Sequence, residues 1–159
     1  MSALSTCLIG EAEAISASAS KLSHGQVEAA LNLLLVCKNN RSKLVITGVG
    51  KSGLVARKIA ATFSSIGLMA IYLNPLDALH GDIGVVSDND LALLLSNSGE
   101  TEEIIAMIPH LKRKQVKLIA LVGCTQSELA RQADVILDGS VDKEVCPLNL
   151  APTASTAVA

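Results

Sequence analysis

Residues 43–53 read KLVITGVGKSG, a short β-branched run that leads into three glycines. The run from Lys43 to Thr47 is typical of a buried strand, because it is short and rich in Val and Ile. Directly after the glycines, residues 52–65 place apolar side chains at helical intervals. This stretch therefore predicts a strand, a tight turn and a helix in succession.

The same alternation continues along the chain. We expect helices at 25–38, 52–65, 101–114 and 127–133, and strands at 43–47, 68–73, 90–96, 117–122 and 135–137. The strand at 90–96 has no polar alternation, which indicates burial on both faces, as in a parallel sheet. A Gly- and Asp-rich loop is expected before it, after the turn formers Asn74 and Pro75. The sequence thus predicts an α/β fold with three layers, α/β/α, around a five-stranded parallel sheet.

The composition narrows the class of partner. Of 159 residues, 50% are apolar and 18% charged, the net charge is −2, and there is one Phe, one Tyr and no Trp. Such a chain offers neither a basic surface for nucleic acid nor aromatic faces on which bases stack. No apolar run approaches the roughly 20 residues that span a bilayer, and no secretory signal opens the chain. The four cysteines lack zinc-ligand spacing. We therefore expect one cytoplasmic domain that binds a small molecule, with no metal, nucleic acid or membrane.

The turn at Gly48–Gly53 satisfies G-x-G-x-x-G, the dinucleotide fingerprint. In that fold the second strand ends in an acid that holds a ribose, whereas here it ends at Asn74. A Walker phosphate loop fits worse, because Val45 stands where its first glycine is required. What remains is a turn whose backbone approaches an anion, with Lys51 adding a charge and Ser52 a hydroxyl. A purely structural turn is the competing interpretation.

A second polar loop follows the strand at 90–96. Ser96, Ser98 and Thr101 surround a glycine at the start of the helix at 101–114, and neutral hydroxyl donors there suit a phosphate monoester. Helix capping also favours Ser and Thr at this place, but it needs only one of them. Because ligands of parallel α/β sheets bind outside the carboxyl ends of the strands, we expect both loops to face a ligand.

Five motifs in order carry a family resemblance. They are GVGKSG at 48–53, LHGD at 79–82, SNSGE at 96–100, KEVCP at 143–147 and LAPT at 150–153. Together, over residues 40–159, they resemble the sugar isomerase (SIS) domain of the arabinose-5-phosphate isomerases. The resemblance implies a flavodoxin-like strand order and a single domain over 1–159, with 1–39 as its N-terminal helical segment.

The resemblance also implies an activity. That family interconverts D-arabinose 5-phosphate and D-ribulose 5-phosphate, which supplies the octulosonate sugar of lipopolysaccharide, and it needs no organic cofactor. Its members usually form tetramers with sites at subunit contacts, so we expect a homo-oligomer. They also carry a histidine-containing segment and tandem CBS domains after this region, and this sequence includes neither. We therefore expect a truncated chain in which sugar-phosphate binding survives better than catalysis.

Site residues follow from matching the motifs. The resemblance places Gly50, Ser52, Ser96, Ser98 and Thr101 at the phosphate, Lys51, Glu103, Glu144 and His80 in catalysis, and Thr153 and Ser155 as further substrate contacts. Aldose–ketose isomerisation moves a proton between C1 and C2 through an enediol, so it needs a carboxylate base and a group that stabilises an oxyanion. A glutamate with a raised pKa suits the first role, and Lys51 or a histidine suits the second.

Simpler explanations compete for some of these residues. The helix dipole accounts for Glu103 in an acidic first turn, and His80 could be a structural histidine. Glu144 has a stronger case, because it lies in a loop where no helix explains it. Two other functions also stay open: a non-catalytic sugar-phosphate sensor, and, further off, a nicotinamide-dependent oxidoreductase, which Asn74 disfavours.

Overall fold

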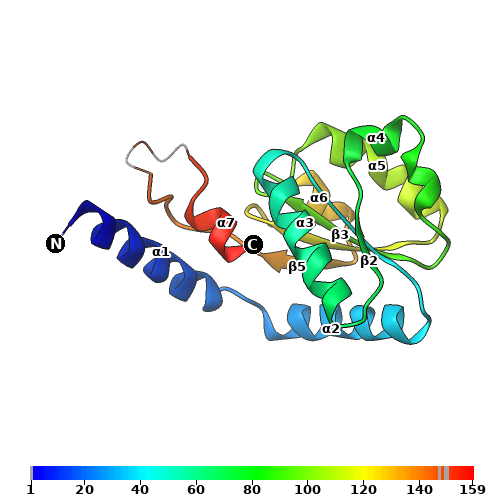
Figure 1. Cartoon of the computed structure of the whole chain (residues 1–159), viewed down its shortest axis with the longest axis horizontal. Coiled ribbons are helices and arrows are strands. Elements are labelled where there is room, and N and C mark those ends of the chain that lie inside the picture. The colour runs from blue at the N-terminus through cyan, green and yellow to red at the C-terminus, as the bar shows by residue number, and fades with distance from the viewer. Residues whose placement is uncertain (1, 147, 149–150) are drawn as a thin grey trace.

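A five-stranded parallel sheet forms the centre of the computed structural model, which describes residues 2–146, 148 and 151–159 (Figure 1). The strands are β1 (Leu44–Gly48), β2 (Ala70–Tyr72), β3 (Leu91–Ser96), β4 (Lys117–Val122) and β5 (Val135–Asp138). Their order is β2-β1-β3-β4-β5, and all neighbouring strands run parallel. Every residue of β1 and β3 is buried, as their lack of polar alternation predicts.

Helices cover both faces of this sheet, which confirms the predicted three layers. One face packs against α4 (Pro75–Leu79), α5 (Glu102–Arg113) and α6 (Glu128–Gln132), and the other against α2 (His24–Asn39) and α3 (Gly50–Ser65). Neighbouring strand residues alternate between the two cores: Val45 packs with the α5 side, whereas Leu44 and Ile46 pack with the α3 side.

The segment between β2 and β3 differs from the expected loop. It contains the short helix α4 and a 3₁₀ helix, η1 (Asp82–Val85). Asn74 and Pro75, whose residue types predict the end of a strand, also begin α4. The Asn74 side chain accepts a hydrogen bond from the Leu76 backbone N–H at 2.9 Å, and Pro75 occupies the first turn of the helix. A turn signal and a helix start use the same residue types.

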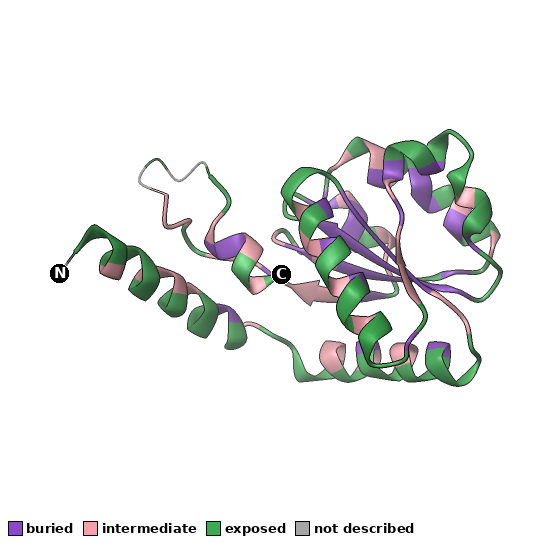
Figure 2. Cartoon of the chain, in the orientation of Figure 1, coloured by how far each residue is buried: buried purple, intermediate pink, exposed green. Residues whose placement is uncertain are grey.

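Two further helices lie toward the ends of the chain. Helix α1 (Ala3–Ala19) extends away from the sheet, and Figure 2 shows it mostly exposed. Near its end, the Ser18 hydroxyl donates to the Ser140 carbonyl at 2.6 Å. Helix α7 (Ala154–Val158) packs between α1 and α3. None of the described helices is long and apolar enough to cross a membrane.

Candidate functional site

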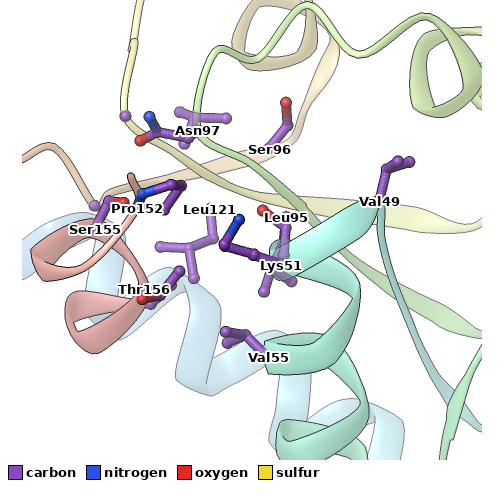
Figure 3. A pocket seen from close by; sticks show the side chains of 15 residues that line it. Val49, Lys51, Val55, Leu95, Ser96, Asn97, Leu121, Pro152, Ser155 and Thr156 are labelled. Carbon is purple, nitrogen blue, oxygen red and sulfur yellow. The ribbon is translucent and has the colours of Figure 1, made fainter. Parts of the chain in front are cut away.

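The carboxyl ends of three neighbouring strands bring the two polar loops together. Gly48 at the end of β1 pairs with Leu95, and Ser96 at the end of β3 pairs with Val122 of β4. A cavity of about 240 Å³ opens at this edge (Figure 3). Its polar lining includes Lys51, Ser52, Ser96, Asn97, Ser155 and Thr156. Its position is the one at which parallel α/β sheets bind ligands.

The first wall of the cavity is the turn that begins α3. The chain doubles back so tightly that a Cβ on Gly48 would lie 2.7 Å from the Ser52 carbonyl carbon, and Gly50 has a φ of 59°. Only glycine fits the first position without displacing backbone, and the second lies in the left-handed region that glycine adopts freely. Val49 precedes the helix and forms no side-chain cap, so the first N–H groups of α3 face the loop edge as anion donors.

The second wall is the loop after β3, where hydroxyls organise the backbone. The buried Ser96 hydroxyl accepts from the Gly99 N–H at 3.0 Å and lies 2.7 Å from the Thr101 hydroxyl oxygen. Ser98 accepts from the Glu100 N–H at 3.2 Å. Of the three predicted hydroxyls, Ser96 lines the cavity, while Ser98 and Thr101 lie on the same loop beside it. Thr101 makes no capping bond to its own helix, so capping does not account for its hydroxyl.

The third wall is α7, which Glu144 holds in place. One carboxylate oxygen, Oε2, accepts from the Thr153 N–H at 2.8 Å, the Thr153 hydroxyl at 3.0 Å and the Ser155 N–H at 3.3 Å. The Thr153 hydroxyl in turn accepts from the Val145 N–H at 2.9 Å. These bonds place Ser155 in the cavity wall, opposite Lys51 (Figure 3).

The same contacts set the ionisation of Glu144. Partial burial raises its pKa, but hydrogen bonds from Ser155 and Thr153 outweigh that effect, and the pKa falls below its usual value. A catalytic base would need a raised pKa. In this conformation the carboxylate is instead ionised and bound to the start of α7, since hydrogen bonds to a charged group favour its charged form.

Three of the four predicted catalytic residues do not line the cavity: His80, Glu103 and Glu144, the last of which lines a neighbouring groove beside α1. His80 is exposed at the end of α4, where its backbone N–H donates to the Asp77 carbonyl at 3.0 Å. Glu103 is half-buried in the first turn of α5, beside Glu102. Neither lines the cavity, so one copy of the chain does not bring them to Lys51.

Other lining residues were not singled out from the sequence. Asn97 and Thr156 each neighbour a predicted residue, and Val55, Leu95 and Leu121 supply apolar walls. Asn97 had a detectable signal, because it lies within the quoted SNSGE motif. The apolar residues had none, since they continue the periodicity of a buried helix and strands.

The charge of the lining favours an anion. Among the described residues that line the cavity, Lys51 is the only charged side chain, and no Asp or Glu is present. The positive end of the α3 dipole lies at the same edge. Across the described part of the chain, no group of three or more His, Cys, Asp or Glu side chains could hold a metal ion.

Comparisons with known proteins agree with this geometry. The SIS domain family matches residues 38–159. The arabinose 5-phosphate isomerase KdsD of Escherichia coli O6:H1 is 49% identical over 128 residues, which cover 79% of this chain and 39% of that protein. The chain thus matches well under half the length of that curated relative.

Two solved structures share the fold. A Listeria monocytogenes protein superposes with a TM-score of 0.92 at 33% identity, covering 98% of this chain and 81% of the other. An Escherichia coli CFT073 protein solved in complex with arabinose 5-phosphate gives a TM-score of 0.90 at 36% identity, covering 98% of this chain and 80% of the other. The chain belongs to the SIS domain family.

Proposed function

We propose that this chain is the sugar-phosphate-binding domain of an isomerase that interconverts D-arabinose 5-phosphate and D-ribulose 5-phosphate. The observation that carries the proposal is the cavity itself: among the described lining residues Lys51 has the only charged side chain, beside the uncapped start of α3 and the hydroxyl of Ser96. The name of the KdsD relative and the sugar-phosphate complex of the solved neighbour support the choice of sugar.

In the proposed mechanism, one set of residues binds the phosphate and another transfers the proton. The N–H groups at Gly50–Ser52 and the hydroxyls of Ser52, Ser96, Ser98 and Thr101 would bind the phosphate. A base removes the proton from C2 of the aldose and a proton returns at C1, while the C2 hydroxyl loses its proton and the C1 oxygen gains one, so that the carbonyl moves from C1 to C2 through the enediol. Lys51 would stabilise the negative charge that develops on the oxygen atoms. The reaction needs no net oxidant or reductant.

The proton-transfer residues belong to the proposal as well. Glu144 lies next to the cavity wall, and a substrate would have to displace its contacts, those with Thr153 and Ser155 among them, before the carboxylate could act as a base. His80 and Glu103 would join the site only from a second copy, and the family resemblance implies sites at subunit contacts. We therefore include a cytoplasmic homo-oligomer, a tetramer by resemblance, in the proposal.

Isotope exchange tests this function directly. The protein extended to the full length of its KdsD relative is incubated with arabinose 5-phosphate in D₂O, and NMR follows ribulose 5-phosphate and the incorporation of deuterium at carbon. The proposal expects product, with deuterium incorporated during the transfer. Binding of the sugar phosphate without product or exchange would indicate a sensor and contradict the isomerase proposal for this chain.

A further inference from the structure

Tyr72, the one tyrosine of the chain, reaches from β2 to the turn that starts the site. Its hydroxyl donates to the Gly48 carbonyl at 3.0 Å. In the sheet Tyr72 pairs with Ile46, so its side chain extends along β1 to the residue where that strand ends. The ring is half-buried on the α3 side, outside the cavity lining.

Two neighbours, Gly53 and Arg57, accommodate the Tyr72 hydroxyl and ring. A Cβ on Gly53 would lie 2.7 Å from the Gly48 oxygen and 3.1 Å from the Tyr72 hydroxyl, closer than almost all real Cβ contacts. The last glycine of the motif therefore leaves room for the bond. On the ring face, the Arg57 guanidinium carbon lies 4.0 Å from the ring centroid, a distance at which a cation attracts an aromatic ring.

The bond constrains the donors of the site through peptide planarity. The Gly48 carbonyl and the Val49 N–H belong to one planar trans peptide, so they point in opposite directions. The hydrogen bond that holds the Gly48 carbonyl toward Tyr72 therefore also holds the Val49 N–H pointing away from Tyr72. Val49 lines the cavity and immediately precedes α3, and Lys51 and Ser52 follow in its first turn.

We propose that Tyr72 is a positioning residue for phosphate binding: its hydroxyl fixes the orientation of the 48–53 turn and so aligns the N–H groups at the start of α3. This inference rests on the proposed function. It adds a residue that does not touch the substrate and that none of the five sequence motifs contains.

A matched control lies at the other end of the same helix. The Ser64 hydroxyl of α3 donates to the Ala70 carbonyl of β2 at 3.0 Å, a hydroxyl-to-carbonyl bond of the same kind that joins β2 to α3 and not to the end of β1. Ser64→Ala therefore removes an equivalent link far from the turn. Tyr72→Phe removes only the hydroxyl and leaves the ring under Arg57.

The experiment measures affinity for arabinose 5-phosphate by calorimetry in the unchanged chain and both variants, with the melting temperature of each. We expect Tyr72→Phe to weaken binding about five-fold, the size of one lost hydrogen bond, and Ser64→Ala to stay within about two-fold. Because the chain has no Trp and one Tyr, its intrinsic emission comes from Tyr72. When arabinose 5-phosphate is added to the unchanged chain, we expect the Tyr72 emission to change and then level off. The half-saturating concentration should equal the dissociation constant from calorimetry.

Three outcomes would overturn the inference. Equal affinity in Tyr72→Phe and the unchanged chain would show that the hydroxyl does not align the turn. Equal weakening in both variants, in step with their melting temperatures, would reduce Tyr72 to a general structural role. If the unchanged chain bound no sugar phosphate, the proposed function would fail first and this inference with it, a result distinct from the other two.

Discussion

Glu144 Oε2 accepts a hydrogen bond from the backbone N–H of Thr153 at 2.8 Å, which ties a predicted catalytic acid to the start of α7. The helix that it holds carries Ser155 and Thr156 into the cavity wall. The ionisation of Glu144 is thereby linked to the shape of the site. A carboxylate that both holds a wall and removes a proton would have to exchange one contact for the other during turnover.

Glu144→Gln should loosen this wall in a pH-dependent way. Because the folded-state pKa of Glu144 is lowered, its stabilisation is complete above the usual carboxyl range and disappears as the pH falls through the folded pKa. We expect the variant to be less stable than the unchanged chain by about 1 kcal/mol at pH 7, and the difference to shrink in acid. Thermal unfolding at several pH values measures it.

The control for this prediction is Glu13→Gln, an exposed carboxylate of α1 on the neighbouring groove. It should leave stability nearly unchanged at every pH. A stability difference for Glu144→Gln that stays constant from pH 7 down to pH 3 would contradict the role of its charge. Turnover, where present, should also fall in Glu144→Gln while the fold stays intact.

Gly99→Ala should damage the loop after β3. Gly99 has a φ of 69°, and an added Cβ would collide with the Ser127 hydroxyl. Left-handed backbone and steric overlap together should cost about 1–3 kcal/mol. Gly25→Ala is the matched control, because a Cβ at Gly25 meets nothing within 4 Å and its φ is not positive. Chemical denaturation of both variants checks the contrast; similar stabilities would argue against this loop conformation.

Lys51→Ala should weaken sugar-phosphate binding without unfolding the chain. Lys51 is exposed and has the only charged side chain among the described residues of the cavity lining, so its loss removes charge from the site but little packing. We expect affinity to fall about ten-fold, as for a lost charge-assisted hydrogen bond. Lys58→Ala removes an exposed lysine from the same helix, outside the lining. Calorimetric titration that finds the two variants equal would remove Lys51 from the site.

Ser96→Ala should lower both stability and sugar-phosphate affinity, whereas Ser98→Ala should lower affinity alone. The buried Ser96 hydroxyl accepts from the Gly99 N–H and lies 2.7 Å from the Thr101 hydroxyl oxygen. Its loss leaves the Gly99 N–H with the Ser96 carbonyl at 3.2 Å alone and should cost about 1 kcal/mol of stability as well as affinity. Ser98 is exposed, and its loss should lower affinity with little change in unfolding. Melting temperatures and sugar-phosphate titrations of both variants test this. If Ser98→Ala lowered the melting temperature and Ser96→Ala did not, the structural role assigned to Ser96 would be wrong.

Local patterns predict most of this fold. The continuous apolar run at 90–96 indicates burial on both faces, and β3 is buried along its whole length. The glycines at 48–53 predict a strand-to-helix turn, and β1 and α3 flank it. The helix after Asn74 was not predicted, because the asparagine that ends a strand can also cap a helix such as α4.

Site residues could be predicted where a polar side chain immediately follows a predicted strand or begins a predicted helix. Lys51, Ser52, Ser96 and Ser155 line the cavity because each lies on a segment that ends at or packs against the carboxyl edge of the sheet. The contact between Glu144 and Thr153 could not be predicted, because it depends on the path of the loop between these residues, which are nine positions apart. Hydrophobic periodicity carries no information on such a path. The roles of His80 and Glu103 stay predictions, since a single copy keeps both outside the cavity.

The most direct test is the melting temperature of this chain with arabinose 5-phosphate, ribulose 5-phosphate, glucose 6-phosphate or NAD. A ligand at 100 times its dissociation constant stabilises the folded state by about 2.7 kcal/mol, which raises the melting temperature by about 5–10 °C for a chain of this size. We predict such a rise with the two pentose phosphates and none with NAD. No rise with any sugar phosphate, or a rise with NAD alone, would contradict a sugar-phosphate site at the ends of β1 and β3.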